Sequence, residues 1–499
     1  MSLPSARDCD TTSKLRSPAQ TRSTGNARDS QPTPDVRLLW PLACIVLTAT
    51  IFYSFVFPLA PVRMTGAPAG LIERSRFWTW VAGLPWPILT DTALAAALLI
   101  VGGLVFLAYG LAVFLCWGRR STSQGLTCVL FSATVFLALS ALALPSLSND
   151  VVDYVLSGRI AATYGASPYE VAPDAFPNDP IRPYASGEYT GDPEQKPPLW
   201  IGAAVVGAAV GGDDPASAVL TFRLGFLVLN LVNLALIAAI LRRWRPDHLL
   251  AGLVLYGWNP VVALHGQGKF DTLMASFALL AALFVVSGRR YAAVASLWAS
   301  VLVKLLPLPL LAAYFLGEIR ARQWRRVALS GILISLMTCI AYSPFAGWVT
   351  LLPDHLALTE RAGSSLPTGI NNLLIAGTLG LVLWVGFSSR ADPEPLLQGW
   401  ALLSLALILL SPISWSWYLM TPLAIVSLSG DRWKSLVAFL LSGLAFLFDT
   451  WNRGSSDAFP LPQPAFMSRS ALYIALVTVA ALVLLAVVFV SKSRATSRS

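Results

Sequence analysis

The chain carries a series of long apolar stretches in which charged residues are scarce. Of its 499 residues, 56% are hydrophobic and only 12% are charged, about half of the roughly 25% found in soluble domains. An apolar run of about 20 residues crosses a bilayer as a helix, because inside lipid every backbone N–H and C=O must be paired within the segment. The sequence therefore predicts an all-α, polytopic integral membrane helix bundle, with about 13–14 spans.

Basic residues gather at the ends of the apolar stretches and set the expected orientation. The net charge is +9, and the arginine pairs Arg119-Arg120 and Arg289-Arg290 directly follow two predicted spans. Positive charges that flank spans stay on the cytoplasmic side. We therefore expect a multi-pass cell-membrane protein with cytoplasmic N- and C-termini and an active site on the outer face. No compact basic face with interleaved aromatic residues occurs, which argues against nucleic acid as a partner.

Polar segments divide the chain into parts. Residues 1–36 are rich in Ser, Thr, Pro and Arg, which predicts a disordered cytoplasmic tail. The membrane domain covers 37–491 with a long outer loop at 146–197, and 492–499 form a cytoplasmic tail. Spans are predicted near 38–59, 90–117, 125–145, 217–241, 249–264, 272–288 and 327–344, with later breaks near 345–369, 388–395, 412–417, 429–434 and 449–469.

Two apolar segments do not suit a single crossing. The segment 199–210 is shorter than a comfortable span, and a crossing there would place the arginines of 242–245 outside. We therefore predict a re-entrant or interfacial helix. The segment 291–318 contains Lys304 and Pro307 and leads into a further group of arginines at 320–326. We expect it to go out and return as two short helices.

A short helix is predicted at the start of the outer loop, in SLSNDVVDYVLSGRIAATYGASPY. Ser148 or Asn149 can cap this helix, and Gly165 with Pro168 can end it. We expect the helix to rest on the membrane surface through its apolar positions, which are Val151, Val152, Val155, Leu156 and Ile160.

Asp150, Asp153 and Tyr154 fall at positions i, i+3 and i+4 of this helix and therefore share one face. Two neighbouring carboxylates can divide catalytic work, because one can stay ionised as a base while the other orients a substrate. We expect both aspartates to be catalytic and Tyr154 to bind substrate. The alternative is structural, with Asp150 as a helix cap and Asp153 as a solvated charge.

Further charged and aromatic residues fall on the expected outer side, where charges near lipid are costly and usually functional. These candidates for substrate binding are Lys196, His265, Lys269, Asp271, Lys304, Trp415 and Tyr418. Structural alternatives are a helix-end ion pair of Lys269 with Asp271, snorkelling of Lys304, and an aromatic belt. Together with the acids, these residues fit a base that takes a proton from a hydroxyl while cations hold a leaving phosphate.

No pattern of metal ligands is present. The five cysteines and three histidines lack CxxC or Cys/His ligand spacing. We therefore expect no cofactor, with a divalent metal ion on Asp150 and Asp153 as the alternative.

Five stretches, taken in order, resemble a known family. They are NDVVDYVLSGRIAATYGASPY, KPPLW, WNPVVALHGQGKFD, LVKLLPLPLL and SPISWSWYL. They are similar to the actinobacterial polyprenyl-phosphate-mannose-dependent α-1,6-mannopyranosyltransferases and related bacterial families, which are many-span glycosyltransferases of the GT-C class. The resemblance implies a GT-C fold and hexosyl transfer from a lipid-linked sugar.

The resemblance also assigns residues. Asp150 with Tyr154 matches the family's D-x-x-x-Y loop motif, whose aspartate is the base. Arg159 falls in its G-R pattern and Tyr169 in its N-P-Y pattern, where Ser167 replaces the usual Asn. Two further departures are Lys196, in place of an aromatic or Tyr-Gly before Pro-Leu, and a longer turn at 266–270, where the family often has His-Asn-Asp.

The mechanism implied by the resemblance is a single displacement with inversion. Asp150 deprotonates a hydroxyl of a glycan or glycolipid acceptor, which attacks the anomeric carbon of a hexose, expected to be mannose, on a polyprenyl-phosphate donor. Lys304, Lys269 and Arg159 stabilise the departing phosphate. A lipid-linked sugar flippase or other transporter is the alternative, although the chain shows no clear internal repeat of the kind common in transporters.

Overall fold

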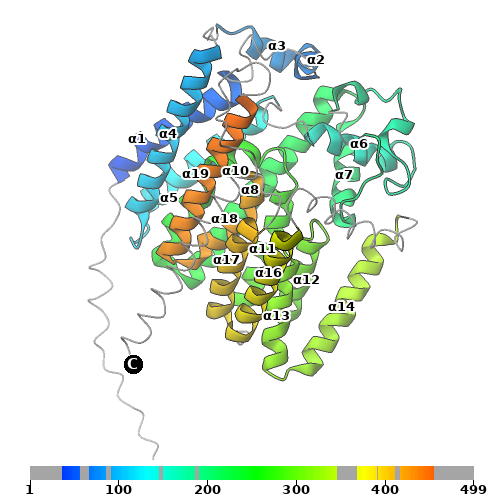
Figure 1. The fold of residues 1–499 in the computed structure, drawn as a ribbon. Helices are drawn as coiled ribbons and strands as arrows, with labels where there is room; N and C mark the ends of the chain where they lie inside the picture. Colours follow the sequence, from blue (N-terminus) through cyan, green and yellow to red (C-terminus); the bar gives the residue numbers. More distant parts are fainter. Residues whose placement is uncertain are drawn as a thin grey trace, which may run out of the picture.

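The computed structural model describes residues 36–56, 67–85, 91–144, 150–185, 190–345, 368–389, 392–410 and 416–454. Within these ranges every regular element is a helix and no strand occurs, so the predicted all-α bundle is confirmed (Figure 1). Apart from Val36, the tail predicted for 1–36 lies outside the described residues, as do the tail 492–499 and the predicted caps Ser148 and Asn149.

Seven helices in the described ranges are long and apolar enough to cross a bilayer. They are α1 (Val36–Ile51) with its continuation η1 (Phe52–Val56), α4 (Asp91–Cys116), α5 (Ser123–Leu142), α8 (Pro215–Trp244), α14 (Trp324–Tyr342), α16 (Thr368–Ser389) and α17 (Pro393–Leu410). These helices follow the continuous apolar runs, because only internal pairing satisfies the backbone in lipid. The chain is a multi-pass membrane protein, and the total of about 13–14 spans stays a prediction.

Further helices complete the described part of the bundle. They are α9 (Leu249–Gly257), α10 (Pro260–His265), α11 (Asp271–Val286), α12 (Arg290–Val301), α13 (Leu308–Arg320), α18 (Met420–Ser429) and α19 (Arg432–Gly454). The two helices expected within 291–318 are present as α12 and α13, separated by an irregular stretch that contains Lys304.

The single span predicted for 249–264 is wrong, because the chain breaks into α9 and α10. Pro260 has no N–H to donate and favours the first position of a new helix. Asn259 caps that helix, since its side-chain Oδ1 accepts from the N–H of Val261 at 2.9 Å. Asn259 is itself fully buried and donates to Tyr109 and Ser442, each at 3.0 Å. The broken helix therefore lies in the protein core and not against lipid.

Two short helices that follow the first span in the chain were not predicted from the sequence. They are α2 (Ala67–Arg74) and α3 (Arg76–Ala82), and they pack against each other beyond the end of α4 (Figure 1). The indole N–H of Trp78 donates to the carbonyl of Leu142 at 3.0 Å, which ties α3 to the end of α5. Both helices are much shorter than a membrane span, so apolar length does not indicate them.

The predicted loop helix is α6 (Asp150–Ala162), and it packs along α7 (Pro198–Gly211) (Figure 1). Contact is close at Gly158, where an added Cβ would lie 2.1 Å from the carbonyl oxygen of Ala204. The helix ends before Gly165, which takes the left-handed conformation at φ +63°. The whole set of apolar positions expected on the membrane surface (Val151, Val152, Val155, Leu156 and Ile160) is instead buried in protein. That expectation is wrong because α7 and its neighbours cover the apolar face.

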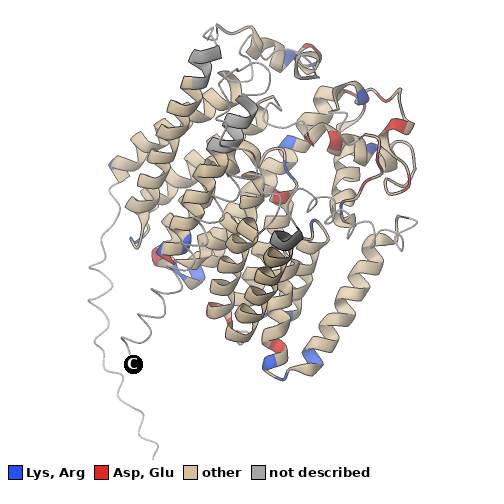
Figure 2. Cartoon of the chain, in the orientation of Figure 1, with Lys and Arg blue, Asp and Glu red and all other residues tan. Residues whose placement is uncertain are grey.

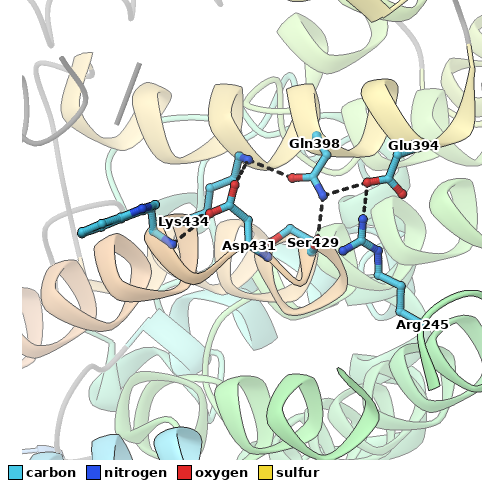
Figure 3. Close-up of polar contacts among 7 residues, drawn as sticks. Arg245, Glu394, Gln398, Ser429, Asp431 and Lys434 are labelled. Carbon is cyan, nitrogen blue, oxygen red and sulfur yellow. Dashed lines mark hydrogen bonds and ion pairs between the residues drawn. The ribbon is translucent and has the colours of Figure 1, made fainter. Parts of the chain in front are cut away.

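In the described part of the chain, many charged residues lie toward the two ends of the bundle (Figure 2). We call the end near α6 and the start of α11 the site end. The other end holds the chain after α8 and the α18–α19 connection, and it carries what we call the opposite-end network (Arg245, Glu394, Gln398, Ser429, Asp431 and Lys434; Figure 3). There Arg245 pairs with Glu394, and Lys434 Nζ lies 2.7 Å from Asp431 Oδ2.

Candidate active site

The site begins at the first turn of α6. Asp150 and Asp153 are partly exposed there, whereas Tyr154 is buried, with its ring edge-on to Trp200 and Phe270. The Tyr154 hydroxyl donates to Asp150 Oδ2 at 3.4 Å. Burial raises the pKa of the Tyr154 phenol well above 10, and the charge of Asp150 adds to the rise. The phenol therefore stays protonated and can only stabilise, not replace, the carboxylate as a base.

Two lysine–carboxylate pairs meet at this point, and we call them the charge cluster (Asp150, Lys269, Asp271 and Lys304). Lys269 from the turn before α11 pairs with Asp150, and Lys304 Nζ lies 2.8 Å from Asp271 Oδ1. The Lys269 side chain is 1% exposed and that of Asp150 is 34% exposed. The alternative of a helix-end pair between Lys269 and Asp271 is not what the fold builds, because each takes a partner from another element.

Aromatic rings from η6 (Ser416–Leu419) lie over both lysines. Lys269 Nζ is 3.4 Å from the centroid of the Trp417 ring, and Lys304 Nζ is 3.6 Å from that of Tyr418. The buried ring of His265 is 5.9 Å from that of Trp417. Tyr418, which the sequence analysis named as a candidate, therefore lies at the charge cluster. Trp417 lies there too, although the sequence analysis did not single it out. Trp415 lies outside the described residues.

Lys196 approaches from the loop that follows α6. Its Nζ lies 2.8 Å from Glu194 Oε1 and 5.6 Å from the centroid of the Tyr154 ring. Glu194 also accepts from the Ser157 hydroxyl of α6 at 2.7 Å. Burial works to raise the pKa of Glu194, but Lys196 and these hydrogen bonds outweigh it and lower the pKa below 4.5. Glu194 was missed because nothing in its sequence context distinguishes it from a solvated loop residue.

Arg159 and Tyr169 hold the loop and do not enter the charge cluster. Arg159 Nε donates to Asp179 Oδ2 at 2.8 Å, and its Nη1 lies 2.9 Å from Asp213 Oδ1. The Arg159–Asp179 pair is almost entirely buried, with side chains 3% and 1% exposed. Tyr169 donates from its hydroxyl to the carbonyl of Lys196 at 2.8 Å. Both residues therefore position the loop that carries Lys196.

The arrangement combines the parts of a group-transfer site. A partly exposed carboxylate can accept a proton, and two ammonium groups beside it can stabilise a departing anion. Within the described part of the chain no group of three or more His, Cys, Asp or Glu side chains is placed to hold a metal ion. That no cofactor is needed, with a divalent metal ion as the alternative, stays a prediction.

The fold and composition define a polytopic α-helical membrane protein with a cluster of paired acidic and lysine side chains at one end of its bundle. The family model for the N-terminal domain of α-(1→6)-mannopyranosyltransferases matches residues 60–322, which is more than half of the chain. The chain belongs to this family and is a mannosyltransferase, a class of glycosyltransferase. The matched region contains the whole charge cluster. No curated protein and no solved structure matches the chain.

Proposed function

We propose that the protein transfers mannose from a polyprenyl-phosphate donor to a glycan or glycolipid acceptor, with inversion, and that Asp150 is the general base. The observation that carries this proposal is the charge cluster. Asp150 is open to a substrate, while the lysine paired with it is enclosed and backed by a second pair. Charges so costly to bury are usually kept for function.

The chemistry follows from these positions. Asp150 removes the proton from an acceptor hydroxyl, whose oxygen bonds to the anomeric carbon as the bond from that carbon to the phosphate oxygen breaks. The electron pair of the broken bond leaves with polyprenyl phosphate. Lys269 and Lys304 stabilise the negative charge that develops on that leaving group. Lys269 exchanges its partner in this scheme, since a phosphate that draws its ammonium group away from Asp150 frees the carboxylate to take the proton.

The remaining residues have supporting roles in the proposal. Asp153 shares the face of Asp150 and orients the acceptor, while Tyr154 holds the Asp150 carboxylate. Lys196 lies over the Tyr154 ring, where it can meet an anionic group of either substrate. We assign no step to a metal ion. Arg159, which the resemblance offers as a phosphate ligand, acts instead through the loop, because Asp179 and Asp213 occupy its guanidinium group.

We also propose that the site end faces outward. The opposite end carries the basic residues of three connections, after α8, between α11 and α12, and between α13 and α14. These are Arg242, Arg243, Arg245, Arg289, Arg290, Arg320, Arg322, Arg325 and Arg326. Positive charge of this kind stays in the cytoplasm. A donor whose lipid chain lies in the bilayer would then present its phosphate and sugar at the level of the charge cluster.

The test replaces Asp150 and measures mannosyl transfer from polyprenyl-phosphate mannose in membranes. We expect Asp150→Asn to lower turnover by about 10²–10⁴-fold, the usual contribution of a general base. Glu394→Gln is the matched control, because it neutralises a carboxylate paired with a cation in the opposite-end network, and it should retain wild-type turnover. Wild-type turnover in a folded Asp150→Asn variant would contradict the base assignment. Movement of the donor between leaflets without transfer would favour a flippase.

A further inference from the structure

The turn at 266–270 holds an unusual buried amide. The Gln267 side chain is fully buried, and neither Oε1 nor Nε2 has a hydrogen-bond partner in the described structure. Four residues further on, Asp271 Oδ2 is also buried without a hydrogen-bond partner among the described residues, although Oδ1 accepts a hydrogen bond from Lys304 Nζ. Each unsatisfied buried group costs about 1–3 kcal/mol. Native proteins rarely keep such groups together unless something else binds them.

The atoms themselves limit what that ligand can be. Gln267 Oε1 and Asp271 Oδ2 only accept hydrogen bonds, whereas Gln267 Nε2 only donates them. A phosphate group, which offers acceptors, could satisfy the amide N–H but would repel the two oxygens. A hydroxyl group both donates and accepts. A ligand with several neighbouring hydroxyls, such as a sugar ring, is therefore the chemical match.

We propose that Gln267 and Asp271 form a subsite that binds the hydroxyl groups of a substrate sugar and so contribute to sugar specificity. The inference rests on the proposed function, and it extends that function to the recognition of the sugar hydroxyls. The subsite adjoins the charge cluster, because Asp271 holds Lys304 and Gln267 lies two residues before Lys269.

The aromatic residue Trp417 of η6 lies beside the subsite. Its ring lies against Lys269 and near His265, the residues two positions after and before Gln267. In the proposed complex, movement of this ring would let the apolar face of the indole pack on the apolar face of the sugar. Both the donor's mannose and a mannose at the end of the acceptor offer the required hydroxyls, and the experiment separates them.

The test uses Gln267→Met in the full-length protein, because methionine keeps the volume of glutamine and removes its polar atoms. We expect the midpoint of thermal unfolding in detergent to stay the same or rise, since two unsatisfied atoms are lost. We expect kcat/KM for transfer to fall by about 5- to 150-fold, which corresponds to about 1–3 kcal/mol. A fall that appears in the KM of polyprenyl-phosphate mannose assigns the subsite to the donor, and one in the KM of a mannoside acceptor assigns it to the acceptor.

Gln398→Met is the matched control. Gln398 is a glutamine of the opposite-end network, and its amide donates to the carbonyl of Ser429 at 2.6 Å and accepts from Lys434 at 2.8 Å. Its replacement should lower the unfolding midpoint and leave kcat/KM unchanged. A Gln267→Met variant that keeps wild-type kcat/KM for both substrates would overturn the subsite.

A binding readout separates this proposal from the proposed function. The shift of the wild-type unfolding midpoint is measured with polyprenyl-phosphate mannose, with bare polyprenyl phosphate and with the mannoside acceptor. A shift that depends on the sugar and disappears in Gln267→Met supports the subsite even if no transfer occurs, in which case only the proposed function fails. If neither mannose-bearing compound distinguishes Gln267→Met from wild type, the subsite is wrong while transfer and its dependence on Asp150 stand.

Discussion

Both ends of the bundle pair basic with acidic side chains, but the most buried of these side chains lie in the charge cluster. In the opposite-end network Arg245 and Glu394 both reach solvent, with side chains 25% and 50% exposed (Figure 3). In the charge cluster Lys269 and Asp271 are almost completely enclosed. An exposed pair joins elements at little cost, whereas a buried pair must offset a large desolvation penalty. The comparison teaches that joining helices does not require buried charge, so we propose a functional explanation for the charge cluster.

The buried ion pairs at the site end are of two kinds, those with complete hydrogen bonding and those without. Arg159 and Asp179 satisfy each other, and Tyr164 and the backbone of Ile181 complete the contacts of the carboxylate. Among the described residues, Asp271 Oδ2 finds no hydrogen-bond partner, and Asp150 keeps a third of its side chain exposed. Completed networks hold a loop in place, while incomplete ones leave atoms for a ligand.

The largest effect on stability is expected from a completed buried pair. Arg159→Met should lower the free energy of unfolding by about 3 kcal/mol, because it leaves Asp179 charged and buried. The measurement is the unfolding midpoint in detergent, with Arg182→Met as the control at the half-exposed Arg182–Asp174 pair. The donor KM of the folded variant should not change. An unaltered midpoint with a raised donor KM would instead place Arg159 on the phosphate.

An intermediate effect is expected at Glu194, whose pKa is lowered in the folded protein. A lowered pKa means that the carboxylate contributes its full stability above its ordinary value of 4.5 and loses it as the pH falls through the folded-state value. The unfolding midpoint of the wild type should therefore drop more steeply below pH 4.5 than that of Glu194→Gln. At neutral pH the substitution should cost about 1 kcal/mol. Parallel pH profiles for the two proteins would show that Glu194 does not stabilise the loop.

The smallest effect is expected in the opposite-end network. Arg245→Gln should change the free energy of unfolding by less than about 1 kcal/mol, because the Arg245–Glu394 pair is open to solvent and screened by salt. The measurement is the unfolding midpoint at low and high salt, where the difference from wild type should shrink as salt rises. A large, salt-independent loss would remove the contrast between the two ends.

Much of the fold is readable from the sequence because the cause is local. Apolar runs such as that of α8 must pair their backbone internally wherever they lie in lipid, so their bounds follow from composition. The spacing of Asp150, Asp153 and Tyr154 places them on one helical face for the same local reason. The pair Asn259-Pro260 carries a local signal for a helix start, a capping residue followed by proline. The prediction of one span at 249–264 followed the continuous apolar run and gave this signal no weight.

The sequence by itself determined that this is a membrane bundle with two acids on one helix face and with lysines in later polar segments of the chain. Only the tertiary structure decided which lysine meets which acid. Lys269 lies 119 positions from Asp150 and Lys304 lies 33 from Asp271, yet these pairs form in place of the local one between Lys269 and Asp271. Tertiary packing likewise enclosed Arg159, brought Glu194 to Ser157 and, within the described residues, left the buried amide of Gln267 without a hydrogen-bond partner. Residue spacing fixes a helical face through local geometry, but partners across helices depend on long-range packing, which spacing alone does not encode.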